Sequence, residues 1–205
     1  MNEEIKSTTN LGDFEDRVRD FCDCMEPALH LLPEDIVERL KRQGFFNAPA
    51  SAVHHGSHEG GLFEHSLNVT RSLVAITEKN GLSWMRPESP YIVGMFHDIC
   101  KQDQYQRLKI GEFRSGPDSE PIYASDEWEY APDILLKGHG DRSVMLLSQH
   151  LPLTMEEILC IRYHMGTFVD KSEWNDYTRA VHIYPNVLWT HTANMVAAHI
   201  LEIDR

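Results

Sequence analysis

The segment "GMFHDICK", residues 94–101, places two ionisable side chains, His97 and Asp98, inside a short apolar run that ends at Lys101. Burying such a pair is unfavourable unless the two side chains pair locally or bind a cation. Imidazole and carboxylate suit Zn, Mn, Fe, Co and Ni, and a carboxylate can bridge two metal ions in hydrolytic sites. The pair therefore raises the hypothesis of a metal site, which other residues must support.

Further histidines lie in segments with helical patterning. The chain has 12 histidines in 205 residues, and three of them, His65, His139 and His164, lie beside apolar residues on separate expected helices. Taken singly, each is better explained as a hydrogen-bonded core residue than as a metal ligand. Residue types and spacing alone leave a metal site and a set of structural histidines as open alternatives.

The segments that carry these residues have the apolar periodicity of helices. Helices are expected over 14–25, from about 32–35 to Gly44, over 60–80, from Pro90 through Asp98, and within 138–150, 154–164 and 186–202. Thr154 followed by Glu157 predicts a capping box. Residues 105–133 mix aromatic and charged residues with Gly and Pro, as a loop or irregular β-hairpin would. The expected fold is all-α, with one irregular insertion around residues 105–133.

Length and composition predict a single domain over residues 1–205, with residues 1–10 flexible. Hydrophobic residues make up 41% and charged residues 25%, as in ordinary globular proteins. No apolar run approaches the ~20 residues that span a bilayer, and the polar N-terminus is not a signal peptide. A cytoplasmic location without a membrane partner is therefore expected. The four cysteines are interpreted as free thiols, because a lone C-x-C pair at Cys22 and Cys24 is weak support for zinc.

The charge balance constrains the partner. The chain has 19 basic and 32 acidic residues, a net charge of −13, which argues against binding long duplex nucleic acid. A small anionic substrate remains compatible, because a bound metal ion reverses the local field.

The ordered set His65, His97-Asp98, His139 and His164 resembles the H…HD…H…H…D signature of the HD-domain superfamily of metal-dependent phosphohydrolases. The segment "PASAVHHGSHEGGLFEHSLNV" resembles the one that introduces the first histidine in bacterial and phage members, and "HDICK" resembles their HDxGK form. The resemblance covers about residues 30–200. It implies an HD-domain helical bundle that holds one or two divalent ions of Mn, Fe, Ni, Co or Zn.

The resemblance also implies a role for each matching residue. His65, His97 and Asp98 would hold a first metal ion, and Asp98 would bridge to a second one held by His139 and His164. The family's final aspartate corresponds to Asn194 in "LWTHTANMVAAH". An amide oxygen is neutral and binds metals more weakly than a carboxylate does. His191, one turn earlier, could compensate, but helix packing is the better explanation for it.

Three residues are candidates for substrate contact. Lys101 corresponds to a lysine that often contacts the substrate phosphate, and a mobile cation suits that catalytic role. His55 falls where related sequences often carry a pocket histidine, and Arg162 could bind a phosphate in a bidentate manner. An exposed loop position for His55 and a salt bridge for Arg162 are equally good explanations.

The favoured function is hydrolysis of a phosphoester or phosphodiester bond by metal-activated water, with a nucleotide or a short or cyclic oligonucleotide as substrate. No G-x-S-x-G or P-loop motif competes with it. Two alternatives stay open: a mixed-valent di-iron oxygenase, and a catalytically impaired nucleotide-binding protein. Three explanations of Asn194 also stay open, namely a natural variant that functions, a natural variant that impairs turnover, and an engineered inactivation. The sequence does not indicate an oligomeric state.

Overall fold

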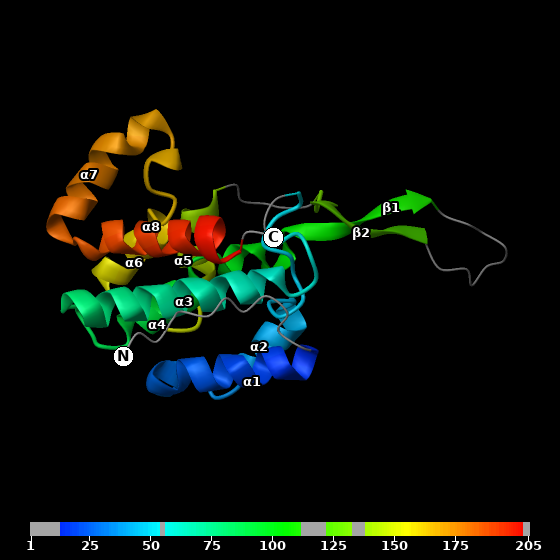
Figure 1. Ribbon diagram of the computed structural model, residues 1–205, viewed down its shortest axis with the longest axis horizontal. Coiled ribbons are helices and arrows are strands. Elements are labelled where there is room, and N and C mark those ends of the chain that lie inside the picture. The colour runs from blue at the N-terminus through cyan, green and yellow to red at the C-terminus, as the bar shows by residue number, and fades with distance from the viewer. Residues whose placement is uncertain (1–12, 54–55, 112–121, 133–137, 203–205) are drawn as a thin grey trace.

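The computed structural model describes residues 13–53, 56–111, 122–132 and 138–202, and over these ranges the chain is mostly helical (Figure 1). The all-α expectation is confirmed. The irregular insertion is an antiparallel hairpin of β1 (Tyr105–Gly111) and β2 (Ile122–Tyr130), which extends away from the helices. Its register pairs Tyr105 with Tyr130 and shifts beyond Arg107.

The first two helices begin and end at clear local signals. The Asp13 side chain accepts hydrogen bonds from the backbone N–H groups of Glu15 and Asp16, which starts α1 (Phe14–Met25). A 3-10 helix, η1 (Glu26–Leu31), follows, and α2 (Ile36–Gln43) then ends at Gly44 with a left-handed φ of 86°. An edge-to-face cluster of phenylalanines joins these helices to the rest of the core; it comprises Phe21, Phe45, Phe46, Phe63 and Phe96.

The central helix, α3 (Gly61–Asn80), packs closely against α4 (Ser89–Phe96). A Cβ atom at Gly94 would lie 2.5 Å from the Thr70 Cα, so only glycine allows this approach of the two backbones. The close packing brings the C-terminal end of α4 beside the N-terminal half of α3. The two ends carry His97 and His65.

A second close pair is formed by α5 (His139–Leu147) and α6 (Met155–Arg162). The expected capping box is present, because the Thr154 side chain accepts from the Glu157 N–H and the Glu157 carboxylate accepts from the Thr154 N–H. A Cβ atom at Gly140 would lie 2.1 Å from the Arg162 carbonyl oxygen. This glycine therefore lets the start of α5 lie against the end of α6.

The C-terminal part contains one helix that the sequence did not predict, α7 (Trp174–Ile183), preceded by two short 3-10 helices, η3 (Gly166–Phe168) and η4 (Lys171–Glu173). Tyr177 and Ala180 of α7 are buried and Val181 packs against the core, so its apolar residues do recur at helical spacing and could have predicted it. The last helix, α8 (Asn186–Val196), packs on α3 and α6 and continues into a π-helical turn, η5 (Ala197–Leu201).

Over the described ranges, the structure contains no helix that is both long and apolar enough to cross a membrane. The cytoplasmic location and the single-domain organisation stay predictions, and residues 1–10 lie outside the described residues.

Candidate metal centre

The His97-Asp98 pair lies at a junction between two helices, not inside one as its sequence context had indicated. Helix α4 ends at Phe96, His97 caps it, and Asp98 has φ −112° and ψ 19° before the 3-10 helix η2 (Ile99–Asp103) begins. The change of helix type at Asp98 turns both side chains toward the interior. Both residues are at most 2% exposed.

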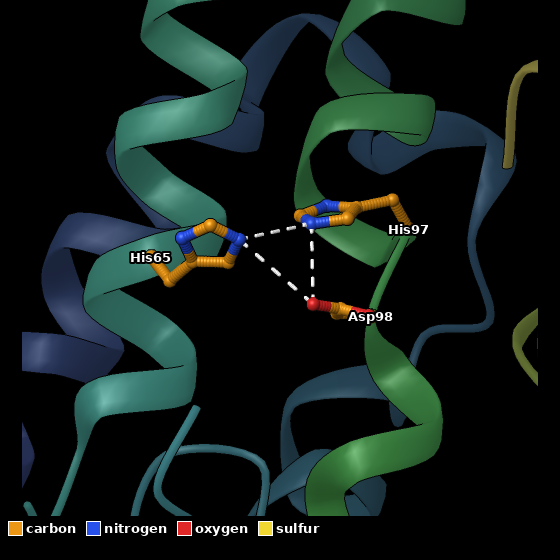
Figure 2. Close-up of side chains that lie close together, drawn as sticks. All are labelled: His65, His97 and Asp98. Carbon is orange, nitrogen blue, oxygen red and sulfur yellow. Dashed lines mark hydrogen bonds and ion pairs between the residues drawn. The ribbon is translucent and has the colours of Figure 1, made fainter. Parts of the chain in front are cut away.

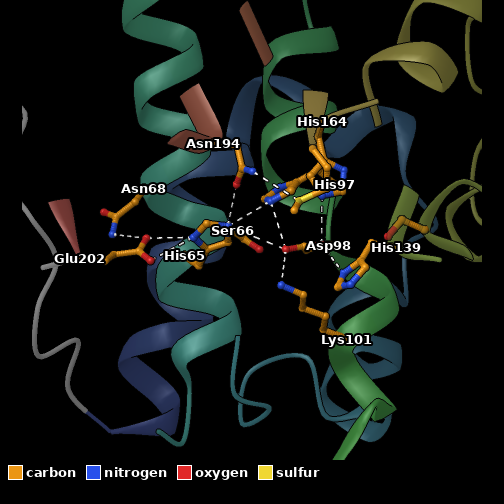
Figure 3. Close-up of polar contacts among 12 residues, drawn as sticks. His65, Ser66, Asn68, His97, Asp98, Lys101, His139, His164, Asn194 and Glu202 are labelled. Atoms are coloured by element: carbon orange, nitrogen blue, oxygen red, sulfur yellow. Dashed lines mark hydrogen bonds and ion pairs between the residues drawn. The ribbon is translucent and has the colours of Figure 1, made fainter. Parts of the chain in front are cut away.

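All six predicted metal-binding side chains meet around the Asp98 carboxylate (Figure 3). Each of five elements contributes: α3 carries His65, the α4–η2 junction carries His97 and Asp98, α5 begins at His139, the turn after α6 carries His164, and α8 carries Asn194. Segments up to 129 residues apart in the chain thus converge on one carboxylate.

The first group of ligand atoms faces Asp98 Oδ2 (Figure 2). His97 Nε2 lies 3.4 Å and His65 Nε2 lies 3.8 Å from this oxygen, and the two nitrogens are 3.2 Å apart. Asn194 Oδ1 lies 3.0 Å from His65 Nε2. Two ligands each about 2.1 Å from one ion are roughly 3.0–3.4 Å apart, so most of these separations match a shared ion.

The second group faces the other oxygen, Asp98 Oδ1. His164 Nε2 lies 3.4 Å and His139 Nδ1 lies 3.7 Å from it. All three atoms are buried, and none has a hydrogen-bond partner among the described residues. Unsatisfied buried polar atoms are rare and costly, and imidazole nitrogens beside a carboxylate oxygen are atoms that could hold a metal ion.

The protons of His97 and His164 point away from the cluster. His97 Nδ1–H donates to the Gly94 carbonyl at 2.8 Å, and His164 Nδ1–H donates to the Ile161 carbonyl at 2.7 Å. Burial lowers the pKa of His97 to about 4, so its ring is neutral at neutral pH. His97 Nε2 therefore carries a lone pair directed at Asp98, and His164 Nε2 faces the same carboxylate, as expected of metal ligands whose other nitrogen is held by the protein.

His65 is held by a residue that the sequence did not reveal. Both carboxylate oxygens of Glu202 lie near His65 Nδ1, at 3.0 and 3.1 Å, and Asn68 donates to one of them at 3.1 Å (Figure 3). Where the Nδ1 proton is donated to Glu202, the His65 Nε2 lone pair faces Asn194 Oδ1 at 3.0 Å and His97 Nε2 at 3.2 Å, and a cation could lie between these acceptors.

Asp98 is ionised in this setting. Burial acts to raise the pKa of Asp98, but the Lys101 ammonium and His97 outweigh it and hold the pKa well below its ordinary value. Lys101 Nζ lies 2.8 Å from Asp98 Oδ2, and its side chain is 11% exposed. Lys101 is therefore part of the cluster and not a solvated residue at a helix end. The Lys101 ammonium balances the negative charge at Asp98 Oδ2, and Asp98 Oδ1 has no hydrogen-bond donor among the described side chains.

Cys100 is a second residue that sequence reasoning missed, and it is a potential metal ligand. Its sulfur lies within 4.8 Å of ligand atoms of Asp98 and His139, and the residue is fully buried. Burial, followed by the nearby Asp98, raises the pKa of the Cys100 thiol to about 12. The prediction of a free thiol agrees with the structure. Cys100 occupies the glycine position of the HDxGK pattern. This departure from the pattern was the signal that could have identified Cys100 as a candidate.

Two of the three candidate substrate residues are found away from the ligand atoms or outside the description. Arg162 pairs with Asp141 at 2.8 Å and with Glu173 at 3.1 Å, as the salt-bridge alternative predicts. Its phosphate contact stays a prediction, and His55 lies outside the described residues. His191 Nδ1 donates to the His164 carbonyl at 3.0 Å, which agrees with the helix-packing interpretation.

Comparison of the chain with protein-family models, with curated proteins and with solved structures gives no match. The interpretation of the cluster therefore depends on its own chemistry. Its buried imidazole nitrogens, carboxylate and thiol could hold a metal ion, and the lone pairs that face one another fit this better than a metal-free hydrogen-bond network.

Proposed function

We propose that the chain is a metal-dependent phosphohydrolase of the HD-domain type, which cleaves a phosphoester or phosphodiester bond of a nucleotide or a short or cyclic oligonucleotide. The observation that carries the proposal is the position of Asp98 between two groups of imidazole nitrogens, one group facing each carboxylate oxygen. This is the arrangement that a carboxylate bridging two metal ions requires.

Each group of side chains has its own place in the proposed chemistry. His65, His97, Asp98 and Asn194 would hold one ion, and Asp98, His139 and His164 the other; the ions would supply a bound water of lowered pKa and polarise phosphoryl oxygens. The backbone carbonyls of Gly94 and Ile161 keep the rings of His97 and His164 oriented. Because the two rings are oriented before the substrate binds, they do not have to reorganise during the reaction.

Lys101 is the proposed contact to the substrate phosphate. Its ammonium lies 2.8 Å from Asp98 Oδ2, beside the first group, and its flexible stem allows it to turn toward an anion. There it would offset negative charge that develops in the transition state. The acidic chain, with a net charge of −13, favours a small phosphorylated substrate over long duplex nucleic acid.

Asn194 supports a second candidate, a nucleotide-binding protein with impaired turnover. Its amide oxygen lies 3.0 Å from His65 Nε2, so it occupies a ligand position without bringing a negative charge. A neutral oxygen holds a divalent ion more weakly than a carboxylate does. The two candidates differ in one respect: only the phosphohydrolase turns substrate over.

The test is metal content and hydrolysis for the unaltered chain and Asn194→Asp, over a panel of nucleoside monophosphates, cyclic nucleotides and dinucleotides with Mn²⁺, Co²⁺, Zn²⁺, Ni²⁺ or Fe²⁺. We expect both proteins to cleave a member of the panel, and Asn194→Asp to bind metal at least about tenfold more tightly. Thr192→Ser, a substitution on the same helix whose hydroxyl donates to the Leu188 carbonyl in an exposed hydrogen bond, is the control and leaves hydrolysis unchanged.

Cleavage by Asn194→Asp alone would favour the impaired binding protein. Metal binding without any cleavage by either protein would contradict the proposed phosphohydrolase.

A further inference from the structure

Cys100 lies beside the second group of ligand atoms, which faces Asp98 Oδ1. The polar atoms of this group lack hydrogen-bond donors among the described residues. The Cys100 sulfur is within 4.8 Å of ligand atoms of Asp98 and His139. Asp98 Oδ1 and His139 Nδ1 are both buried without a hydrogen-bond partner in that part of the chain, and so is His164 Nε2. Three potential ligand atoms of three chemical kinds, from Asp98, Cys100 and His139, thus lie within 4.8 Å of one another, and His164 Nε2 contacts the same Asp98 oxygen.

The packing of α5 fixes Cys100 in this position. Ser143 lies one turn after His139 on α5, and its hydroxyl accepts a hydrogen bond from the Cys100 N–H at 3.3 Å. The same face of α5 therefore holds the η2 backbone and presents His139. Because Cys100 and Ser143 are both fully buried, the thiol has little freedom to turn toward solvent.

Cys160 provides a contrast within the same chain. It is as deeply buried as Cys100, and it lies on α6 beside Thr190 of α8. All four cysteines lie in the described ranges, and there only Cys100 belongs to a group of potential metal ligands. Burial alone therefore does not explain the position of the Cys100 thiol beside a carboxylate and an imidazole.

We infer that Cys100 is a thiolate ligand of the ion position that it forms with Asp98 and His139, and that this position selects thiophilic ions such as Zn²⁺, Co²⁺ or Fe²⁺ over Mn²⁺ and Mg²⁺. The inference rests on the proposed metal centre and adds a ligand and a metal class to it. Thiolate is a soft ligand that favours zinc and iron, whereas Mn²⁺ and Mg²⁺ prefer oxygen. When the ion binds, the sulfur–metal bond forms and the thiol proton passes to solvent.

The test is an anaerobic Co²⁺ titration of the reduced full-length chain, followed by absorption spectroscopy. All proteins carry Cys22→Ser and Cys24→Ser, so that the C-x-C pair cannot contribute sulfur. We expect a sulfur-to-cobalt charge-transfer band in the near ultraviolet together with visible ligand-field bands. Cys100→Ser should lose the charge-transfer band and keep ligand-field bands, whereas the matched Cys160→Ser should keep both.

A competition experiment measures the selectivity. The ratio of Zn²⁺ to Mn²⁺ affinity should fall at least about tenfold in Cys100→Ser and stay unchanged in Cys160→Ser. Cobalt binding with no charge-transfer band, or with a band that persists in Cys100→Ser, would overturn the inference.

Zinc X-ray absorption of the Cys22→Ser, Cys24→Ser protein keeps the inference testable if Cys100→Ser does not fold. A sulfur shell at about 2.3 Å supports it, and a shell of nitrogen and oxygen alone overturns it. A sulfur-ligated ion without phosphoester cleavage would contradict only the proposed function, and cleavage without sulfur ligation would contradict only the role of Cys100. Failure to bind any ion would overturn both.

Discussion

Two buried polar clusters in this molecule are built in opposite ways. In the first, Glu156 and Glu157 of α6 accept a hydrogen bond at every carboxylate oxygen. Arg86 binds Glu157 through two contacts of 2.7 Å, and the other donors to Glu157 are Ser89 Oγ and the Thr154 N–H. Glu156 accepts from the Met85 N–H at 2.7 Å and from the Asn186 amide at 2.9 Å.

In the second cluster, around Asp98, nitrogen and oxygen atoms face one another, and three of them, Asp98 Oδ1, His139 Nδ1 and His164 Nε2, have no hydrogen-bond partner among the described residues. Asp98 Oδ1 and His164 Nε2 are 3.4 Å apart, and the nitrogens of His65 and His97 are 3.2 Å apart. The first cluster is complete within the chain and ties α6 to α8 and to the segment before α4. The second could be completed by a cation, which would distinguish a binding site from a structural network of similar burial.

The largest expected effect on stability comes from breaking the complete cluster. Glu157→Gln should lower the free energy of unfolding by about 3–5 kcal/mol, because it removes the charge from a fully buried carboxylate and leaves Arg86 without its counterion. Urea unfolding in EDTA, followed by circular dichroism, measures this change.

The matched substitution in the incomplete cluster is Asp98→Asn, measured under the same metal-free conditions. The change should stay within about 1.5 kcal/mol, because the lost Lys101 ion pair is offset by an amide N–H that can donate to a histidine lone pair. A loss as large as that of Glu157→Gln would mean that the Asp98 cluster is already complete without an ion.

An effect smaller than that of Glu157→Gln is expected from loosening a metal ligand. Glu202→Gln should weaken Zn²⁺ or Co²⁺ binding about 10–100-fold, because the Glu202 carboxylate no longer fixes the His65 tautomer and orientation. Competition with a chromophoric chelator measures the affinity. Glu64→Gln is the control, since Glu64 contacts His58 at 3.0 Å outside the cluster. Equal affinities for Glu202→Gln and the unaltered chain would remove Glu202 from the metal centre.

The smallest effect is a pH dependence of the metal-free protein. His97 has a pKa of about 4 when folded and about 6.5 when unfolded, so the unfolded chain binds the extra proton between these values. Stability is therefore fully present above pH 6.5 and is lost as the pH falls toward 4. From pH 7 to pH 5.5, His97 should contribute a loss of about 1 kcal/mol.

Chemical unfolding of the unaltered chain and His97→Asn in EDTA isolates this contribution. The asparagine amide of the variant can replace Nδ1–H as donor to the Gly94 carbonyl but does not titrate, so the stability of the variant should depend less on pH over this interval. Identical pH profiles would show that His97 is not buried as a neutral ring.

Much of the fold and of the candidate site could be predicted because the signals are local. Gly44 ends α2, Thr154 and Glu157 cap α6, and the periodicity of residues 60–80 gave the extent of α3. The six side chains predicted as ligands lie around Asp98, and their metal binding stays a prediction. Helix α7 was missed although Tyr177, Ala180 and Val181 have helical spacing.

The missed site features depend on contacts between distant segments. Glu202 reaches His65 across 137 residues, and no motif surrounds it. The junction at Asp98 and the inward position of Cys100 depend on how η2 packs on α5, which local propensity does not determine. Glycines at 94 and 140 allow the close helix pairs, yet their effect is visible only once the partners Thr70 and Arg162 are known.

The most direct test of the central claim is the number of metal ions bound per chain, measured by elemental analysis after EDTA treatment, reloading with Zn²⁺ or Co²⁺ and removal of excess ion. The chain should retain one or two ions, and binding should raise its unfolding temperature. Asp98→Asn, which is expected to fold in EDTA, should retain fewer ions than the unaltered chain and show no such rise. A chain that retains no ion, or an Asp98→Asn protein that retains as many as the unaltered chain, would contradict the account.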